Sequence, residues 1–92
     1  MEIEFDPKKR LATLQTRGVD MEDVPLVFAG PTLTVLDDRQ DYGEKRYITI
    51  GLLRRRMFIV VWTPRGAAYR IISMRKANAR EQKAYGAQLA RS

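Results

Sequence analysis

Residues 56–76, RMFIVVWTPRGAAYRIISMRK, constrain the fold more than any other stretch of the chain. Met57–Thr63 is a continuous apolar run rich in β-branched and aromatic residues, and Tyr69–Met74 is again β-prone, so each run is typical of a strand. Between them, Thr63-Pro64-Arg65-Gly66 has type I turn chemistry, with Pro at the second position and Gly at the fourth. The pattern predicts a buried β-hairpin with cationic side chains at its tip and at both ends.

The flanking segments predict three helices and three further strands. Strands are expected at 1–5, 32–36 and 46–53, and the helices are expected from Asp6-Pro7 to Gly18, from Asp20 or Asp23 to about Gly30, and from Asn78 onward. Because Arg54-Arg55-Arg56 is a short connection, the strand before it should be the antiparallel neighbour of Met57–Thr63. The order β-α-α-β-β-β-β-α predicts an α+β fold, a small antiparallel sheet with helices on one side.

The composition excludes several kinds of chemistry. The length of 92 residues indicates one domain. The chain has no cysteine and no histidine, so it lacks thiolates, the commonest metal ligand and the commonest general base near neutral pH. Catalysis would have to use Arg, Lys, Glu, Asp, Tyr, Ser or Thr, and we expect neither a metal nor another cofactor. With no leader-like N-terminus and no apolar run near the ~20 residues of a membrane helix, we also expect no membrane contact.

The net charge of +6 is distributed unevenly along the chain. Residues 1–45 contain 6 Lys and Arg against 10 Asp and Glu, whereas residues 46–92 contain 11 Lys and Arg and only Glu81. Such a concentration of positive charge repels itself, and binding of a polyanion relieves that repulsion. The alternative interpretation is a solvated basic surface that only aids solubility.

Three blocks of sequence carry a family resemblance. In order, VDMEDVPLVFAGP, DYGEKRYITIG and VVWTPRGAAYRIISMRKANAREQKAY resemble the blocks of the BrnT-type toxins of bacterial type II toxin–antitoxin modules, over about Phe5 to Leu89. The resemblance implies a single RelE-like domain over residues 1–92, with a twisted antiparallel sheet, two N-terminal helices packed on one face and a C-terminal helix. It also implies a cytoplasmic ribonuclease that cleaves mRNA and inhibits translation. The implied partner is a cognate, BrnA-like antitoxin that neutralises the toxin and represses the operon, so DNA would be contacted only through the complex.

Cleavage of RNA through its own 2′-hydroxyl needs a proton acceptor, cations for the phosphorane charge and a proton donor. Because the guanidinium fork holds two phosphate oxygens, Arg suits charge stabilisation. The candidate catalytic residues are Arg75, Arg65, Arg70, Glu44, Lys76 and Tyr85, with Glu81 as a further acid or base. The candidate RNA-binding residues are Arg54, Arg55, Arg56, Arg46, Tyr47, Tyr69, Arg80 and Lys83.

Several of these assignments have a plain structural alternative. Glu44 could instead form a salt bridge with Arg46 or Arg70, and Tyr85 could simply pack in the core. On a regular strand Arg70 would share a face with Met74, while Arg75 would share the opposite face with Tyr69 and Ser73. Tyr47 and Tyr69 could stack on bases or belong to the core, Phe58 and Trp62 are expected in the core, and residues 54–56 could dock an acidic antitoxin segment.

Two functions from different classes therefore compete. The first is a metal-independent endoribonuclease toxin, which the arginines of the hairpin together with Glu44 and Tyr85 favour. The second is a catalytically silent module that binds nucleic acid or antitoxin and acts in complex formation and operon repression. The absence of the histidines that relatives carry favours this alternative, since the chain has Thr16-Arg17-Gly18 and Gln40-Asp41 at those places.

Overall fold

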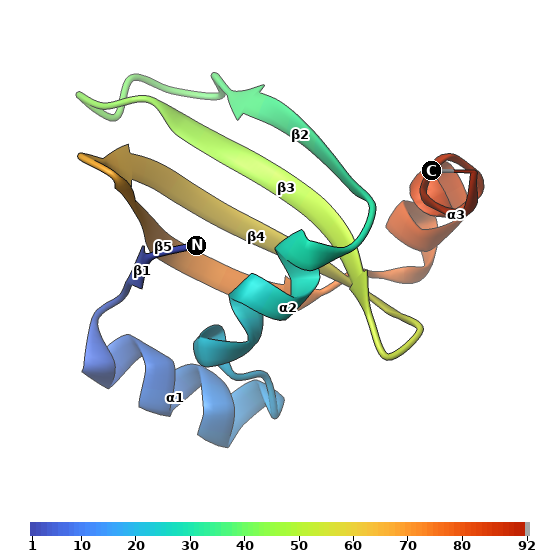
Figure 1. Cartoon of the computed structure of the whole chain (residues 1–92), viewed down its shortest axis with the longest axis horizontal. Helices are drawn as coiled ribbons and strands as arrows, with labels where there is room; N and C mark the ends of the chain where they lie inside the picture. The colour runs from blue at the N-terminus through green and yellow to red at the C-terminus, as the bar shows by residue number, and fades with distance from the viewer. Residues whose placement is uncertain (92) are drawn as a thin grey trace.

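Five strands form one twisted sheet in the order β1-β5-β4-β3-β2 (Figure 1), in a computed structural model that describes residues 1–91. The elements are β1 (Ile3–Glu4), α1 (Pro7–Arg17), the 3-10 helix η1 (Met21–Asp23), α2 (Val24–Ala29), β2 (Thr32–Asp37), β3 (Arg46–Leu53), β4 (Arg56–Arg65), β5 (Ala68–Lys76) and α3 (Ala79–Ala90). Helices and strands follow one another as predicted for an α+β fold. The sheet is mixed rather than antiparallel, because β1 pairs in parallel with β5, Ile3 lying opposite Tyr69. A two-residue strand carries no sequence signal for its direction.

The hairpin of β4 and β5 forms as predicted, but its turn lies further along the chain. Arg65 still pairs with Ala68, so the loop consists of Gly66 and Ala67 alone. Gly66 has a φ of 59°, the positive value that short hairpin loops require and that only glycine adopts without strain. The predicted type I turn over residues 63–66 is wrong, since Pro64 belongs to β4 and lies opposite Tyr69.

The turn between β3 and β4 is built from two arginines in an unusual backbone conformation. Leu53 pairs with Arg56, which leaves Arg54 and Arg55 as a two-residue loop. Both have positive φ, 52° and 67°, as a type I′ turn needs. Side chains other than those of Gly, Asn and Asp rarely take this conformation because Cβ crowds the following carbonyl oxygen. The local strain therefore falls on two cationic residues.

One face of the sheet is covered by η1 and α2. Asp20 caps η1 by accepting from the Glu22 amide at 2.9 Å, and α2 begins after Asp23, as expected if Pro25 lies in its first turn. The core on this side consists of Val19, Met21, Val24, Val27, Phe58, Val60, Ile71 and Met74. The helix approaches β3 closely, because a Cβ on Gly51 would lie 2.7 Å from Cγ1 of Val27. A side chain at Gly51 would force the two apart.

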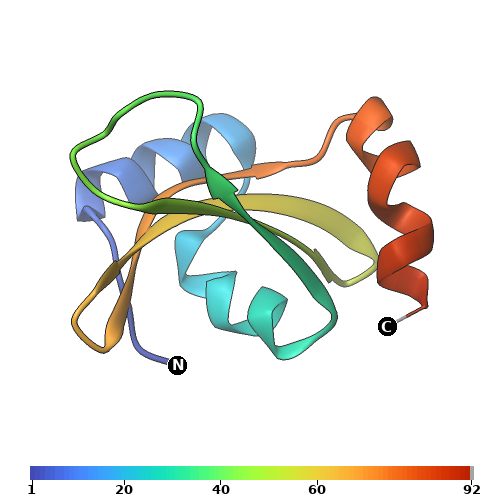
Figure 2. The same cartoon turned by 90° about the horizontal axis from the view of Figure 1, so that it is seen from above.

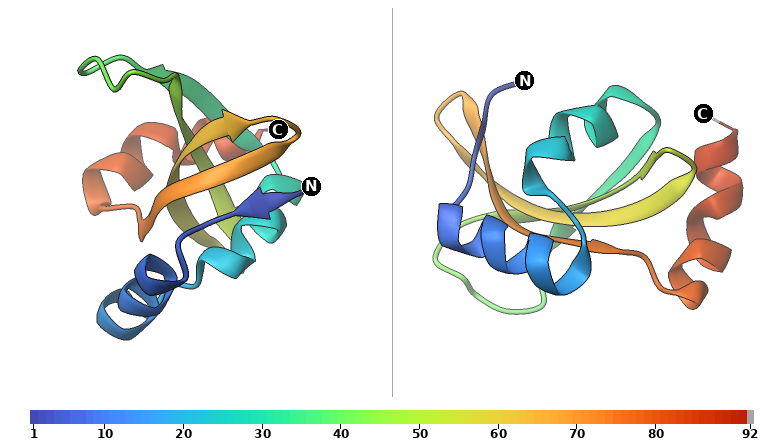
Figure 3. Two further views of the ribbon diagram at one scale, coloured as in Figure 1. Left: turned by 90° about the vertical axis from the view of Figure 1, so that its left-hand side faces the viewer. Right: turned by 90° about the horizontal axis from the view of Figure 1, so that it is seen from below.

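The C-terminal helix packs on the opposite face of the sheet (Figures 2 and 3). It begins with a capping box in which Asn78 accepts from the Glu81 amide and Glu81 accepts from the Asn78 amide. Its Leu89 belongs to a second core cluster with Ile50 and Ile59. The prediction that all helices lie on one side is therefore wrong. The continuous apolar run of β4 supplies side chains to both faces, as in strands that are buried on both sides.

Candidate functional site

A β-bulge decides which way the arginines of β5 project. Val61 lies opposite Ser73 while Trp62 lies opposite Ile71, so Ile72 is an extra residue in β5. Residues opposite each other in an antiparallel pair project to the same face. Arg70, opposite Thr63, and Arg75, opposite Ile59, therefore share one face. The prediction that they point to opposite faces is wrong, as is the pairing of Arg70 with Met74 on a core side.

We call this side the arginine face and define it by Arg46, Arg70, Ser73 and Arg75. The strand register puts Arg46 on the same side, two residues before Ile48, which lies opposite Val61. The loop over residues 38–45 and helix α2 lie on different sides of the sheet, the loop next to the arginine face (Figure 2). Two strands of the sheet, β3 and β5, thus contribute cations or polar groups to one surface, and α3 bounds it at one end.

Four predicted site residues meet in one cleft at the end of the sheet where the β4–β5 hairpin turns. The cleft has a volume of about 270 Å³, and its lining includes the predicted residues Glu44, Arg46, Arg65 and Arg70. The Nε of Arg46 donates to Oε2 of Glu44 at 3.1 Å, so the predicted alternative of a Glu44–Arg46 salt bridge is confirmed. We call this opening the Glu44 cleft. It combines two carboxylates, Glu44 and the helix-capping Asp6, with several cations, the groups that proton transfer and phosphate charge require.

The remaining partners of these arginines are weak. Arg70 has an ion pair with Glu4 at 4.0 Å, the limit for such a contact. Within residues 1–91, Arg65 has no acidic group inside that distance. A guanidinium without an internal partner is available for an external anion, and Arg65 is therefore the freest of the three arginines that line the cleft.

A buried aspartate holds the loop that delivers Glu44. Asp37, at the end of β2, accepts from Nε of Arg39 at 2.7 Å and from the hydroxyl of Tyr42 at 3.1 Å. The hydrogen bonds from Arg39 lower the pKa of the Asp37 carboxyl to about 2, so it stays ionised near neutral pH. The ring of Tyr42 in turn lies 4.1 Å from the guanidinium of Arg46. These contacts fix both members of the Glu44–Arg46 pair.

Arg75 lies outside the Glu44 cleft and is already paired. Its two terminal nitrogens donate to the two oxygens of Glu81, each at 2.8 Å. The bidentate pair lowers the pKa of Glu81 to about 2 and raises that of Arg75. Arg75 lines a different opening, of about 420 Å³, with Arg17, Val19 and Lys76. The predicted catalytic set is thus divided between two places.

The two tyrosines predicted to stack on bases lie on the face opposite the arginines. Tyr47 stacks on Trp62 with ring centroids 4.9 Å apart, and Tyr69 lies against the same indole at 4.6 Å. Phe28 of α2 closes the cluster edge-on. The prediction that Tyr69 shares a face with Arg75 is therefore wrong, because the bulge puts Tyr69 on the core side. The expected core positions of Trp62 and Phe58 are confirmed, the former half-buried against the cluster under α2.

The other predicted residues are distributed over the surface. Arg54, Arg55 and Arg56 are exposed at the β3–β4 turn and have no ion pair with any part of the chain that the structure describes. Arg80 and Lys83 are exposed on α3, whereas Tyr85 packs against the cluster around Leu89, as its structural alternative predicted. Residues 1–91 contain no group of three or more His, Cys, Asp or Glu side chains that could hold a metal, and no helix among them is long and apolar enough to cross a membrane.

Sequence reasoning missed two cations of α1. Lys9 lines the Glu44 cleft, and Arg17 lines the opening beside Arg75, where its Nη1 lies 3.5 Å from the carbonyl oxygen of Met74. The two residues are eight positions apart and so lie along one side of the helix. Together with Thr13 and Thr16 they line a third opening against β5. This polar stripe, rather than the charge of any one residue, is the signal that could have placed α1 beside the arginine face.

Comparison with known proteins identifies a family for the chain. No curated protein matches the chain. A family model described as "Ribonuclease toxin, BrnT, of type II toxin-antitoxin system" matches residues 5–81, which include the Glu44 cleft and the Arg75–Glu81 pair. The matched segment spans most of the chain, so the protein belongs to the BrnT family of ribonuclease toxins of type II toxin–antitoxin systems.

Proposed function

We propose that this toxin is a metal-independent endoribonuclease that cleaves mRNA in the Glu44 cleft. The observation that carries the proposal is the meeting of Glu44, Arg46, Arg65 and Arg70 in one opening of about 270 Å³. Membership of a ribonuclease toxin family supports RNA as the substrate. The proposal includes a single RelE-like domain over residues 1–92 that acts in the cytoplasm.

The chemistry follows from which groups are free. Oε2 of Glu44 accepts from Arg46, while Oε1 has no hydrogen-bond partner in residues 1–91 and can take the proton of a ribose 2′-hydroxyl. The resulting oxygen attacks the adjacent phosphorus, and Arg65 and Arg70 bind the equatorial oxygens as negative charge grows. The bond to the 5′-oxygen breaks, and that oxygen takes a proton from Lys9, the one cleft cation other than arginine. The products are a 2′,3′-cyclic phosphate and a free 5′-hydroxyl.

Arg75 and Lys76 act in this scheme outside the reacting centre. Glu81 already satisfies both terminal nitrogens of Arg75, so a phosphate would have to displace a carboxylate to bind there. Lys76 has no ion pair within residues 1–91 and lies beside Arg17 in the same opening. We propose that this opening, together with Arg80 and Lys83, binds the RNA backbone beyond the scissile bond, and that Tyr85 has a packing role.

The antitoxin would compete for the same surface. The excess of positive charge over residues 46–92 favours a partner with acidic segments, and the arginine face is where a bound segment would exclude RNA. We propose a BrnA-like antitoxin that covers the Glu44 cleft. DNA would be contacted by the antitoxin, with the toxin attached to the complex.

One observation favours the alternative of a catalytically silent module. The internal Arg75–Glu81 pair occupies an arginine that the nuclease hypothesis put first among the catalytic candidates. In a silent module, the arginine face would bind RNA or antitoxin without proton transfer. The purified protein would then cut no RNA, with or without a substitution of Glu44.

Cleavage of a short oligoribonucleotide in the presence of EDTA separates the two. We expect cutting by the purified toxin, loss of cutting when the RNA carries 2′-deoxy sugars, and a decrease of about 10²-fold or more for Glu44→Gln. Arg65→Ala should slow cleavage to a similar degree. Glu2→Gln and Lys8→Ala, which remove exposed charges outside the cleft, are the matched controls. Full activity of Glu44→Gln would refute the site, and no cleavage of any RNA would favour the silent module.

A further inference from the structure

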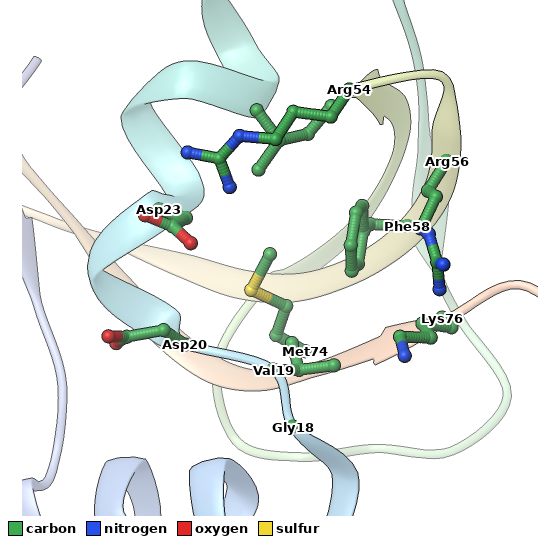
Figure 4. A pocket seen from close by; sticks show the side chains of 10 residues that line it. Gly18, Val19, Asp20, Asp23, Arg54, Arg56, Phe58, Met74 and Lys76 are labelled. Carbon is green, nitrogen blue, oxygen red and sulfur yellow. The ribbon is translucent and has the colours of Figure 1, made fainter.

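A further cavity opens at the other end of the sheet, where β3 turns into β4. It has a volume of about 220 Å³ (Figure 4). Its lining combines apolar side chains with both signs of charge, and the residues used below are Asp23, Arg54, Arg56, Phe58, Met74 and Lys76. Pockets for drug-sized ligands run from about 300 to 1,000 Å³, so this volume suits one planar base rather than a larger molecule.

The floor of the cavity is apolar and includes an aromatic ring. Phe58 is 7% exposed and Met74 is 1% exposed, and both belong to the core under α2. In Figure 4 the Phe58 ring and the Met74 side chain lie between two charged sides. A nucleobase bound there would contact the phenyl ring of Phe58 and the thioether of Met74. Such contacts bind unstacked bases in RNA complexes.

One carboxylate at the rim is free to accept hydrogen bonds. Asp20 is taken by Arg10, which donates to both of its oxygens at 2.8 and 2.9 Å, and it points away from the cavity in Figure 4. The backbone amide of Asp23 donates to the carbonyl oxygen of Asp20 at 3.0 Å, but the Asp23 carboxylate has no hydrogen bond and no ion pair within residues 1–91, and it does not cap α2. Asp23 is half-buried, so binding of a donor group would restore hydrogen bonds that partial burial removes.

Three cations at the same opening have no ion pair within residues 1–91. Arg54 extends beside Asp23, and Arg56 and Lys76 lie on the opposite side of Phe58 (Figure 4). The left-handed backbone at Arg54 is maintained although a residue such as asparagine would adopt it with less strain. The cavity therefore presents a carboxylate, an aromatic floor and cations for a phosphate.

We propose that this cavity binds a guanine nucleotide of the RNA. Guanine presents two adjacent N–H groups, N1–H and the 2-amino group, to both oxygens of one carboxylate, which accepts but cannot donate. Adenine and cytosine have a ring nitrogen acceptor beside their single amino group, and uracil has a carbonyl oxygen on each side of its N–H group. Each of these bases would therefore place at least one lone pair against an oxygen of Asp23, and the two would repel each other. Arg54, Arg56 and Lys76 bind the phosphate of the same nucleotide.

The site is separate from the Glu44 cleft and rests on the proposed function only in treating the nucleotide as part of RNA. A guanine bound here would fix the register of the strand on the toxin and so limit which bond reaches Glu44. Free guanosine 5′-monophosphate and a guanine within an oligoribonucleotide share this chemistry, and the experiment measures both.

The test is a titration of the ¹⁵N-labelled full chain with each of the four nucleoside 5′-monophosphates, followed by amide shifts. We expect the guanine nucleotide to bind about tenfold more tightly than the others, with shifts at Gly18, Val19 and Lys76. Asp23→Asn should remove this preference, and Arg54→Ala should weaken all four nucleotides alike. Short oligoribonucleotides with and without one guanine should show the same order.

The controls keep the inference distinct from folding and from catalysis. Within residues 1–91 the Asp23 carboxylate makes no hydrogen bond, so Asp23→Asn should leave the amide spectrum of the free protein otherwise unchanged. Asp38→Asn removes an equal charge from an exposed loop position. Arg65→Ala should leave guanine binding intact. Equal affinity for all four nucleotides, absence of shifts at millimolar concentration, or an undiminished preference in Asp23→Asn would each overturn the proposal. Guanine binding by a chain that cuts no RNA would refute the proposed function alone.

Discussion

Replacing the Arg54-Arg55 turn by Asn-Gly should stabilise the toxin while weakening its binding to RNA. A left-handed backbone costs an ordinary residue about 1 kcal/mol or more, and both arginines adopt it. Asn tolerates the conformation and Gly adopts it freely. Gly also gives the unfolded chain more conformational entropy, which offsets about 0.5–1 kcal/mol of the stabilisation. The net gain is about 1 kcal/mol of unfolding free energy. For a domain of this size it raises Tm by roughly 4–8 °C.

The same change removes two cations from an exposed position. Each phosphate contact with single-stranded nucleic acid contributes about 0.7 to the slope of log K against log salt concentration. If Arg54 and Arg55 both contact phosphate, the slope should decrease in magnitude by about 1.4. Stability and affinity would then change in opposite directions, which is the signature of residues kept for binding rather than for folding.

Thermal unfolding and fluorescence titration of a labelled, non-cleavable oligonucleotide at several salt concentrations measure the two effects. The matched control is the double variant Arg54→Ala with Arg55→Ala, which removes both charges but keeps a strained backbone. It should reproduce the loss of slope without the rise in Tm. Equal Tm values for the two variants would refute the argument from strain, and an unchanged slope would refute the phosphate contacts.

Three further outcomes follow from other contacts. Arg75 lowers the pKa of the Glu81 carboxyl to about 2. The contribution of Glu81 to the free energy of unfolding is therefore complete above pH 5 and is lost as the pH falls towards 2. Asp20, whose pKa is also lowered to about 2, should lose its contribution over the same range. Because Arg75 is 42% exposed, Glu81→Gln should lower unfolding free energy at pH 7 by only roughly 1 kcal/mol, and by almost nothing at pH 2, as measured by urea denaturation. Gly51→Ala should destabilise by about 1–3 kcal/mol in the same assay, because the new Cβ would overlap Val27; an unchanged midpoint would show that α2 can shift. Cleavage, if present, should persist in EDTA, and restoration of lost activity by Mg²⁺ or Mn²⁺ would identify a metal requirement.

Local signals in the sequence predicted local structure well. Asp6 and the Asn78–Glu81 capping box predicted two helix starts, because their hydrogen bonds involve neighbouring residues only. The bulge at Ile72 could not be predicted in the same way. Two adjacent isoleucines fit either a regular or a bulged strand, and the packing of both sheet faces decides which one is extra.

The candidate site was predictable in composition but not in arrangement. Glu44, Arg65 and Arg70 were selected for chemistry, and their meeting depends on the bulge and on the loop that Asp37 holds. Arg75 was also a catalytic candidate, yet its partner Glu81 comes from the first turn of a helix whose direction of approach the sequence does not specify. Long-range geometry, set by which faces bury apolar area, was the missing information.

The parallel pairing of β1 with β5 ties completion of the Glu44 cleft to late synthesis of the chain. Ile3 finds its partner, Tyr69, only after most of the chain has been made, and β5 also supplies Arg70 to the cleft. Chains emerge from the ribosome at about 5–20 residues per second, and such distant contacts form late in folding. The Glu44 cleft is consequently completed only after β5 has been made, so the residues of the proposed cleavage site stay apart until then.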